Sequence, residues 1–167
     1  MAVLVLMYAM TMMTACKNNE EPTPDVITIT ASVVKFHVFV SEDFAGYADI
    51  TAEYYDDNGV VQKEVLKAGQ WDKTVTAKLP STHGLRMSAQ HKEGATAKAA
   101  KYRCDYEYYY LLSDGTMARK GGSGFGSEVS FGSTEKLDIW FKQIQAVMGN
   151  ILITYDEKGK ITEGEWD

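Results

Sequence analysis

Residues 71–79 read WDKTVTAKL, and apolar and polar side chains alternate along this stretch. The even positions, from Asp72 to Lys78, are all polar, whereas the odd positions are apolar except for Lys73. A period of two is typical of a β-strand that buries one face and wets the other. The alternation resumes over residues 85–91 after a turn at 80–84, so we predict that the two segments form an antiparallel hairpin.

The same alternation continues upstream of this pair. Residues 48–54 alternate as far as the Asp56-Asp57-Asn58-Gly59 segment, where Asn-Gly supplies the positive φ angles that a tight reversal needs. Apolar residues hold one parity from Ile27 to Val33 and the other parity from Val34 to Val40. This shift predicts a bulge or a change of sheet near Ser32 to Val34.

The C-terminal half also reads as strands, with a last hairpin turn predicted over residues 156–160. The residues expected to share faces are Tyr102, Cys104, Tyr106, Tyr108, Tyr110 and Leu112, then Leu137, Ile139 and Phe141, and finally Ile151, Ile153 and Tyr155. We expect the tyrosine series to be the buried face of a long strand, although display of this series for binding is an alternative. The count is about eight strands, and no segment indicates an amphipathic helix of three turns. These features predict an all-β fold, an antiparallel Ig-like β-sandwich, with a lipocalin-like barrel as the alternative.

The N-terminus reads MAVLVLMYAMTMMTA over residues 1–15 and contains no charge. It is shorter than the roughly 20 apolar residues that span a bilayer as a helix, which favours a signal peptide. The segment Met13-Thr14-Ala15-Cys16 resembles the lipobox of bacterial lipoproteins. This resemblance implies that Cys16 becomes the first mature residue and carries a diacylglyceryl thioether and usually an N-acyl chain, which together give a stable membrane anchor. Because no basic residue precedes the apolar run, we expect the true start codon to lie upstream.

Residues 16–25 contain two prolines and nothing apolar after Cys16, which predicts a disordered tether of up to about 30 Å. Residues 26–167 are then expected to form a single β-sandwich domain. The segment ITAEYYDDNGVVQKEVLKAGQWDKTVTAKLPSTHGLRMSAQHK, residues 50–92, resembles small outer-membrane or surface lipoproteins of Bacteroides-type bacteria. That resemblance, which covers about residues 12–92, implies a lipid-anchored β-domain at the outer membrane, on its periplasmic face or at the cell surface. It carries no catalytic residue with it.

Charge and cysteine content argue against several other classes of protein. Seventeen basic and twenty-three acidic residues give a net charge of −6 with no basic stripe, so nucleic acid is not an expected partner. With Cys16 lipidated, Cys104 has no disulfide partner and is expected to be a small buried side chain. The histidines at 37, 83 and 91 show no metal-ligand spacing, so no metal and no cofactor are expected.

Three residues are candidates for a binding surface. Tyr109 points away from the other tyrosines of the YEYYY run, and Phe125 lies in a glycine-rich segment, residues 119–126, which we expect to be a long hairpin loop rather than a phosphate loop. Trp140 has the parity opposite to Leu137 and Phe141, so it is either exposed or in a strand buried on both faces.

The sequence contains no recognisable catalytic arrangement, so we expect a protein that is not an enzyme, although acids brought together by folding remain an alternative. The expected function is that of a lipid-anchored envelope module that binds a glycan or another surface protein. The alternative is a structural subunit, such as a fimbrillin-like component, that assembles through an open sheet edge.

Overall fold

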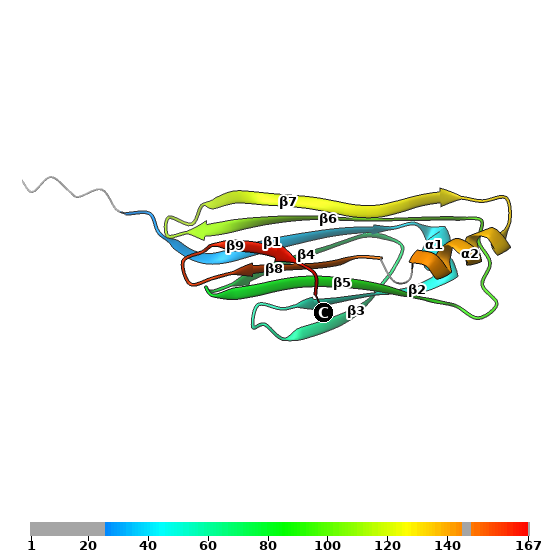
Figure 1. Cartoon of the computed structure of the whole chain (residues 1–167), viewed down its shortest axis with the longest axis horizontal. Helices are drawn as coiled ribbons and strands as arrows, with labels where there is room; N and C mark the ends of the chain where they lie inside the picture. The colour runs from blue at the N-terminus through cyan, green and yellow to red at the C-terminus, as the bar shows by residue number, and fades with distance from the viewer. Residues whose placement is uncertain (1–25, 145–147, 167) are drawn as a thin grey trace, which may run out of the picture.

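The computed structural model describes residues 26–144 and 148–166, which form a sandwich of two antiparallel sheets (Figure 1). One sheet has the strand order β4-β1-β6-β7, and the other has the order β3-β2-β5-β8-β9. The sheets do not close into a barrel, so the predicted β-sandwich is confirmed and the lipocalin-like alternative is not. The signal segment, the tether and Cys16 lie outside the described residues.

Nine strands and two helices are present in the described part of the chain. They are β1 (Ile29–Val40), α1 (Glu42–Tyr47), β2 (Ala48–Tyr55), β3 (Val61–Leu66), β4 (Gly69–Ala77), β5 (Ser81–His91), β6 (Ala99–Leu112), β7 (Met117–Ser130), α2 (Thr134–Ile144), β8 (Asn150–Tyr155) and β9 (Ile161–Gly164). The hairpin turns predicted at residues 56–59 and 156–160 are confirmed, and they join β2 to β3 and β8 to β9. Gly59 and Gly159 adopt positive φ angles of 74° and 82° in these turns.

The core lies between the sheets, where alternate residues of the strands meet. Phe36 and Val38 of β1 face Ile50 of β2 and Leu85 of β5, and all four are fully buried. The tyrosine face of β6 belongs to this core, because Tyr102, Cys104, Tyr106 and Tyr108 are buried. Burial raises the pKa of the Cys104 thiol to about 12, which keeps it protonated and unreactive at neutral pH.

The hairpin predicted for residues 71–79 and 85–91 is wrong. The first segment is β4, which pairs with β1 through contacts such as Val34 opposite Val75, and the second belongs to β5, which pairs with β2 and β8. The connection at residues 78–80 therefore crosses from one sheet to the other. Alternation fixes which face of a strand is buried, but it does not fix which strand lies beside it.

The irregularity predicted in the first strand is present, but it occurs earlier. The register between β1 and β6 shifts between Ile29 and Ala31, and β1 stays within one sheet. Val33 and Val34 are both buried although they point to opposite faces, which explains why the sequence shows two parities.

Residues 137–141 are not a strand, because they lie in the helix α2. Leu137 and Phe141, four residues apart, are buried, whereas Ile139 is 56% exposed. The apolar positions 137, 140, 141 and 144 have the spacing of one helix face, and this spacing competes with the alternation that suggested a strand. Among the described residues, neither helix is long and apolar enough to cross a membrane.

The glycine-rich segment of residues 119–126 is part of strand β7 and not a loop. Its glycines lie against the backbone of β6: a Cβ placed on Gly122 would be 2.4 Å from the carbonyl oxygen of Tyr106, and one on Gly126 would be 2.5 Å from that of Tyr102. Glycine is therefore required for this close strand pairing, and its abundance here does not indicate a flexible loop.

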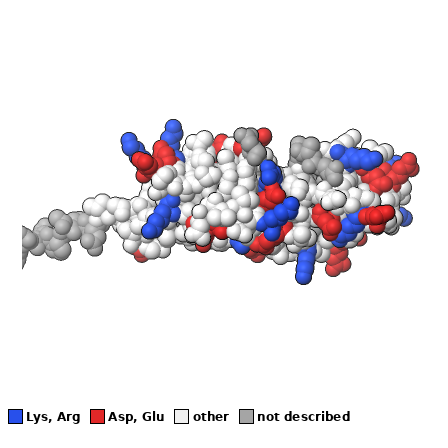
Figure 2. Space-filling model, turned by 90° about the horizontal axis from the view of Figure 1, so that it is seen from below, with Lys and Arg blue, Asp and Glu red and all other residues white. Residues whose placement is uncertain are grey.

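The sandwich is elongated, with α1 and α2 at one end and the start of the described chain at the other (Figure 1). The turns between β2 and β3, β6 and β7, and β8 and β9 lie at the end where the chain enters. On the face shown in Figure 2, acidic and basic side chains are interspersed, and a broad uncharged area lies toward this entry end.

Candidate functional site

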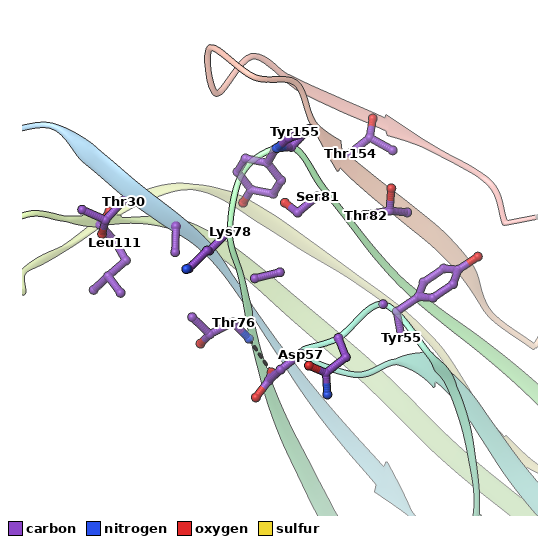
Figure 3. A pocket seen from close by; sticks show the side chains of 15 residues that line it. Thr30, Tyr55, Asp57, Thr76, Lys78, Ser81, Thr82, Leu111, Thr154 and Tyr155 are labelled. Carbon is purple, nitrogen blue, oxygen red and sulfur yellow. Dashed lines mark hydrogen bonds between the residues drawn. The ribbon is translucent and has the colours of Figure 1, made fainter.

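A pocket with a volume of about 1100 Å³ lies at the entry end of the sandwich (Figure 3). Both sheets contribute to it, because β1, β4 and β6 belong to one sheet and β2, β5 and β8 to the other. The residues that line it are Thr30, Ala31, Tyr55, Asp57, Asn58, Gly59, Thr76, Ala77, Lys78, Pro80, Ser81, Thr82, Leu111, Thr154 and Tyr155. Five hydroxyl side chains of serine or threonine, one carboxylate, one amide and one ammonium group are thus available to a ligand.

One wall is the turn between β2 and β3, which Asp56 holds in shape. The Asp56 carboxylate accepts hydrogen bonds from the backbone N–H groups of Asn58 and Val60, each at 2.9 Å. These bonds, that from Val60 foremost, lower the pKa of Asp56 and keep it ionised. The ordered turn directs Asp57 toward the other sheet, where its carboxylate accepts a bond of 2.7 Å from the backbone N–H of Thr76 (Figure 3).

The floor of the pocket leads to a buried polar chain of three side chains. The Ser81 hydroxyl, which lines the pocket, lies 2.6 Å from the Ser32 hydroxyl, and Ser32 lies 2.7 Å from Nε2 of His83. Ser32 also donates to the carbonyl of Ala77 at 3.1 Å, so His83 donates through Nε2 and Ser32 accepts. Nδ1 of His83 is buried and has no hydrogen-bond partner in the described part of the chain.

Burial lowers the pKa of His83 to about 4, so the imidazole is neutral at pH 7. A neutral histidine beside a serine suggests nucleophilic catalysis, but Ser32 is fully buried and cannot reach a substrate. Ser81, which does reach the pocket, bonds to Ser32 and not to the imidazole. The hydrogen-bonded side chains of Ser81, Ser32 and His83 therefore hold the pocket floor in place and do not form a catalytic serine–histidine pair.

The described residues contain no cluster of His, Cys, Asp and Glu that could hold a metal ion. The pocket chemistry is that of hydrogen bonding: hydroxyl groups both donate and accept, Asn58 does the same, and Asp57 accepts. In Figure 3 the ring of Tyr55, a lining residue, points away from Lys78 and Ser81.

The three residues predicted from the sequence to form a binding surface do not come together. Trp140 is half-buried in α2, where its ring packs near Phe44 and Phe131 at the helical end. Phe125 is half-buried, and its ring fills the space beside Gly149, where a Cβ would approach it to 2.0 Å. Tyr109 lies on the outer face of β6, with its hydroxyl bonded to Glu107 and the Lys35 ammonium 5.1 Å from its ring.

An exposed aromatic platform is also absent among the described residues. Every phenylalanine, tyrosine and tryptophan there is at least partly buried, and the exposed large apolar side chains are valine, isoleucine and methionine. Trp71, for example, donates its indole N–H to Glu64 at 2.9 Å. If the protein binds a sugar, hydrogen bonds rather than an open stacking surface have to supply most of the contacts.

Sequence reasoning missed the pocket because its residues come from six strands and two connections. It placed His83 in a turn, but His83 lies within β5 and is fully buried. One signal could have corrected this, since Ser81 and His83 continue the parity of Leu85, Met87 and Ala89.

A second surface is the outer edge of β7, which we call the β7 edge. Among the described strands β7 pairs with β6 alone, so its other side is a row of unpaired backbone N–H and C=O groups.

Comparisons with protein-family models, with curated proteins and with solved structures found no match for this chain.

Proposed function

We propose that this protein is a lipid-anchored module of the bacterial cell envelope that binds a hydroxyl-rich ligand, such as a glycan segment, without catalysing a reaction. The anchor is Cys16, within the lipobox-like segment 13–16, and residues 16–25 are the tether. The location is the outer membrane, on its periplasmic face or at the cell surface. The single observation that supports the binding function is the pocket at the entry end.

The composition of the pocket favours a neutral, hydroxylated ligand. Thr30, Thr76, Ser81, Thr82 and Thr154 supply hydroxyl groups, and Asp57 and Asn58 supply the planar groups that can each bond two neighbouring hydroxyls of a sugar. Asp57 and Lys78 offset one another in charge, so a strongly anionic or cationic ligand gains little. The bracing bonds of Asp56, Asp57 and Ser32 hold the walls before any ligand arrives, which reduces the entropy lost on binding.

Binding is tested by titrating the protein with a panel of neutral and acidic oligosaccharides and measuring heats by calorimetry. Thr82→Val removes one exposed hydroxyl while keeping the side-chain shape, and it should weaken binding roughly fivefold to tenfold, the cost of about one hydrogen bond. Thr74→Val is the matched control, because Thr74 is exposed on β4 and does not line the pocket. Absence of binding across the panel, or equal losses in both variants, would count against the pocket.

The anchor is tested separately by feeding cells an alkyne fatty acid and recovering the labelled protein. The unmodified chain should carry the label and fractionate with membranes, whereas Cys16→Ser should lose both properties because no thiol is left to form the thioether. A label that persists in the Cys16→Ser variant contradicts the assignment of Cys16.

The alternative function, a structural subunit that assembles with other chains, is favoured by one observation, the unpaired β7 edge. An open edge of this kind can accept a strand from another molecule.

A further inference from the structure

Exposed apolar side chains gather at the entry end of the sandwich. Seven large ones are exposed in the described residues: Val26, Ile27, Val60, Val61, Val65, Met117 and Ile139. Five of the seven belong to this end, because two begin the described chain, two follow the turn between β2 and β3, and one follows the turn between β6 and β7. Val65 lies farther along β3, and Ile139 lies in α2 at the opposite end (Figure 1). Single exposed apolar residues are ordinary, but their concentration at one end indicates an apolar partner.

The pocket adjoins two of these residues in the chain. Val60 follows Gly59 directly, and Ile27 precedes Thr30 by three residues; Gly59 and Thr30 both line the pocket. Apolar residues also line the pocket itself, namely Ala31, Ala77, Pro80 and Leu111. The pocket and its surroundings therefore suit a ligand in which a hydroxylated group is joined to a hydrocarbon part.

The proposed anchor brings this end of the domain close to lipid. The tether of residues 16–25 reaches at most about 30 Å, and Val26, which follows it, lies at the entry end (Figure 1). The sandwich is longer than the tether, because the 14 residues of β6 alone span about 45 Å. With its helical end on the membrane, the domain would hold Val26 beyond the reach of the tether. The entry end is therefore the end that the anchor can bring against the bilayer.

The charges at this end favour a neutral lipid headgroup. The three turns there and residues 78–80 contain five acidic residues and three lysines: Asp56, Asp57, Asp114, Asp156, Glu157, Lys78, Lys158 and Lys160. Adsorption to anionic lipids is driven by clusters of basic residues, and these segments have no excess of positive charge. Within the pocket, Asp57 and Lys78 offset one another in the same way.

We infer that the pocket binds the neutral sugar headgroup of a glycolipid in the membrane that holds the anchor, while the exposed apolar side chains of the entry end contact the lipid interface. This inference rests on the proposed function, because it names the ligand class of the same pocket and uses the same anchor. The sugar hydroxyls bond to the threonine and serine hydroxyls, and the apolar side chains leave water when the entry end meets the bilayer. The lipid-linked sugar should therefore bind more tightly than the same sugar free in solution.

The experiment compares a sugar in its lipid-linked and free forms. The protein is residues 16–167 with Cys16→Ser, which lacks the acyl chains and the apolar run of residues 1–15 but keeps every described strand, helix and core residue. It is sedimented with phosphatidylcholine vesicles that contain digalactosyl or diglucosyl diacylglycerol, and with vesicles of phosphatidylcholine alone. The free headgroups, digalactosyl and diglucosyl glycerol, are titrated by calorimetry. We expect one glycolipid to be bound roughly tenfold more tightly than either phosphatidylcholine alone or its own free headgroup.

Two isoleucines with the same exposed fraction, 56%, test the apolar contact. Ile27→Ser, at the entry end, should weaken binding to the glycolipid vesicles roughly threefold to tenfold and leave the affinity for the free headgroup unchanged. Ile139→Ser, at the helical end, is the matched control and should change neither affinity. Thr82→Val should weaken both, because Thr82 lines the pocket.

Three results would overturn the inference: glycolipid vesicles bound no better than phosphatidylcholine alone, equal losses in Ile27→Ser and Ile139→Ser, or vesicle binding that Thr82→Val leaves unchanged. Binding of a free headgroup without a preference for its lipid form would also overturn it, although the proposed binding function would then stand. Absence of binding to both forms would count against the inference and the proposed function together.

Discussion

Acidifying the domain from pH 7 to pH 5 should lower its free energy of unfolding by about 2 kcal/mol through His83 alone. The folded state holds this imidazole in the core, where burial lowers its pKa from 6.5 to about 4. The unfolded chain exposes the same group, which then takes up a proton below pH 6.5. The stabilisation is thus complete above the unfolded pKa and is lost as the pH falls toward the folded pKa.

The size of the effect follows from these two pKa values. At pH 5 most unfolded chains carry a proton on His83 and most folded chains do not. This difference shifts the folding equilibrium roughly 30-fold toward the unfolded state, which corresponds to about 2 kcal/mol. At pH 7 the corresponding value is only about 0.2 kcal/mol. Most of this loss of stability therefore occurs at pH values above those at which ordinary carboxyl groups begin to titrate.

The measurement is urea unfolding of residues 26–167, followed by tryptophan fluorescence, at closely spaced pH values between 7 and 5. His83→Gln retains a nitrogen donor that can reach Ser32 but cannot titrate, so its stability should change by less than about 0.5 kcal/mol over this range. His91→Gln, at an exposed histidine, is the control and should behave like the unmodified domain. If His83→Gln loses as much stability as the unmodified domain, then His83 is not the source of the pH dependence.

Four further substitutions test the packing by urea unfolding and fluorescence. Leu137→Ala should cost about 2–5 kcal/mol because it opens a cavity, whereas Ile139→Ala should cost less than about 0.5 kcal/mol, and equal losses would contradict the helix. Gly149→Ala should cost at least about 2 kcal/mol because the new Cβ meets the ring of Phe125, and an unchanged midpoint would show that the ring moves away freely. Asn150→Ala removes two hydrogen bonds to the backbone of the C-terminal tryptophan, so fluorescence should shift to the red with a loss of about 1–2 kcal/mol; an unshifted spectrum would contradict this.

The fold class could be predicted from the sequence because it depends on local patterns. Alternation along residues 71–79 and 102–112 and turns such as Asn58-Gly59 are consequences of neighbouring residues, and they indicated these strands and the hairpin turns at 56–59 and 156–160 correctly. Strand partners depend on the path of the whole chain, so β4 and β5 were joined in one hairpin although they belong to different sheets.

Helix α2 and the glycine-rich strand β7 show two different limits of structure prediction from the sequence. The apolar residues within 134–144 fit both the two-residue period of a strand and the 3.6-residue period of a helix. The sequence analysis predicted a strand, but the burial of Leu137 and Phe141 follows the helical period. For β7 the glycines serve a tertiary contact, the close approach to the carbonyls of Tyr102 and Tyr106, which no local rule reveals. The pocket was missed for a similar reason, since its hydroxyl groups look like ordinary surface residues in the sequence and come together only when eight segments of the chain meet.

Trp166 packs against Tyr55, a residue that lines the pocket, so its intrinsic fluorescence is sensitive to changes there. Its indole stacks on Tyr55 at 4.4 Å between ring centroids, and it covers Gly84, where a Cβ would lie 2.9 Å from it. Tyr55 also lines the pocket, so a ligand that shifts the main chain there moves the aromatic partner of the indole. If the pocket binds a ligand as proposed, its occupancy should therefore change the emission of Trp166 and be measurable without a dye. An affinity tag for such work belongs at the N-terminal side of residue 26, because one fused to the C-terminus would disturb the reporter.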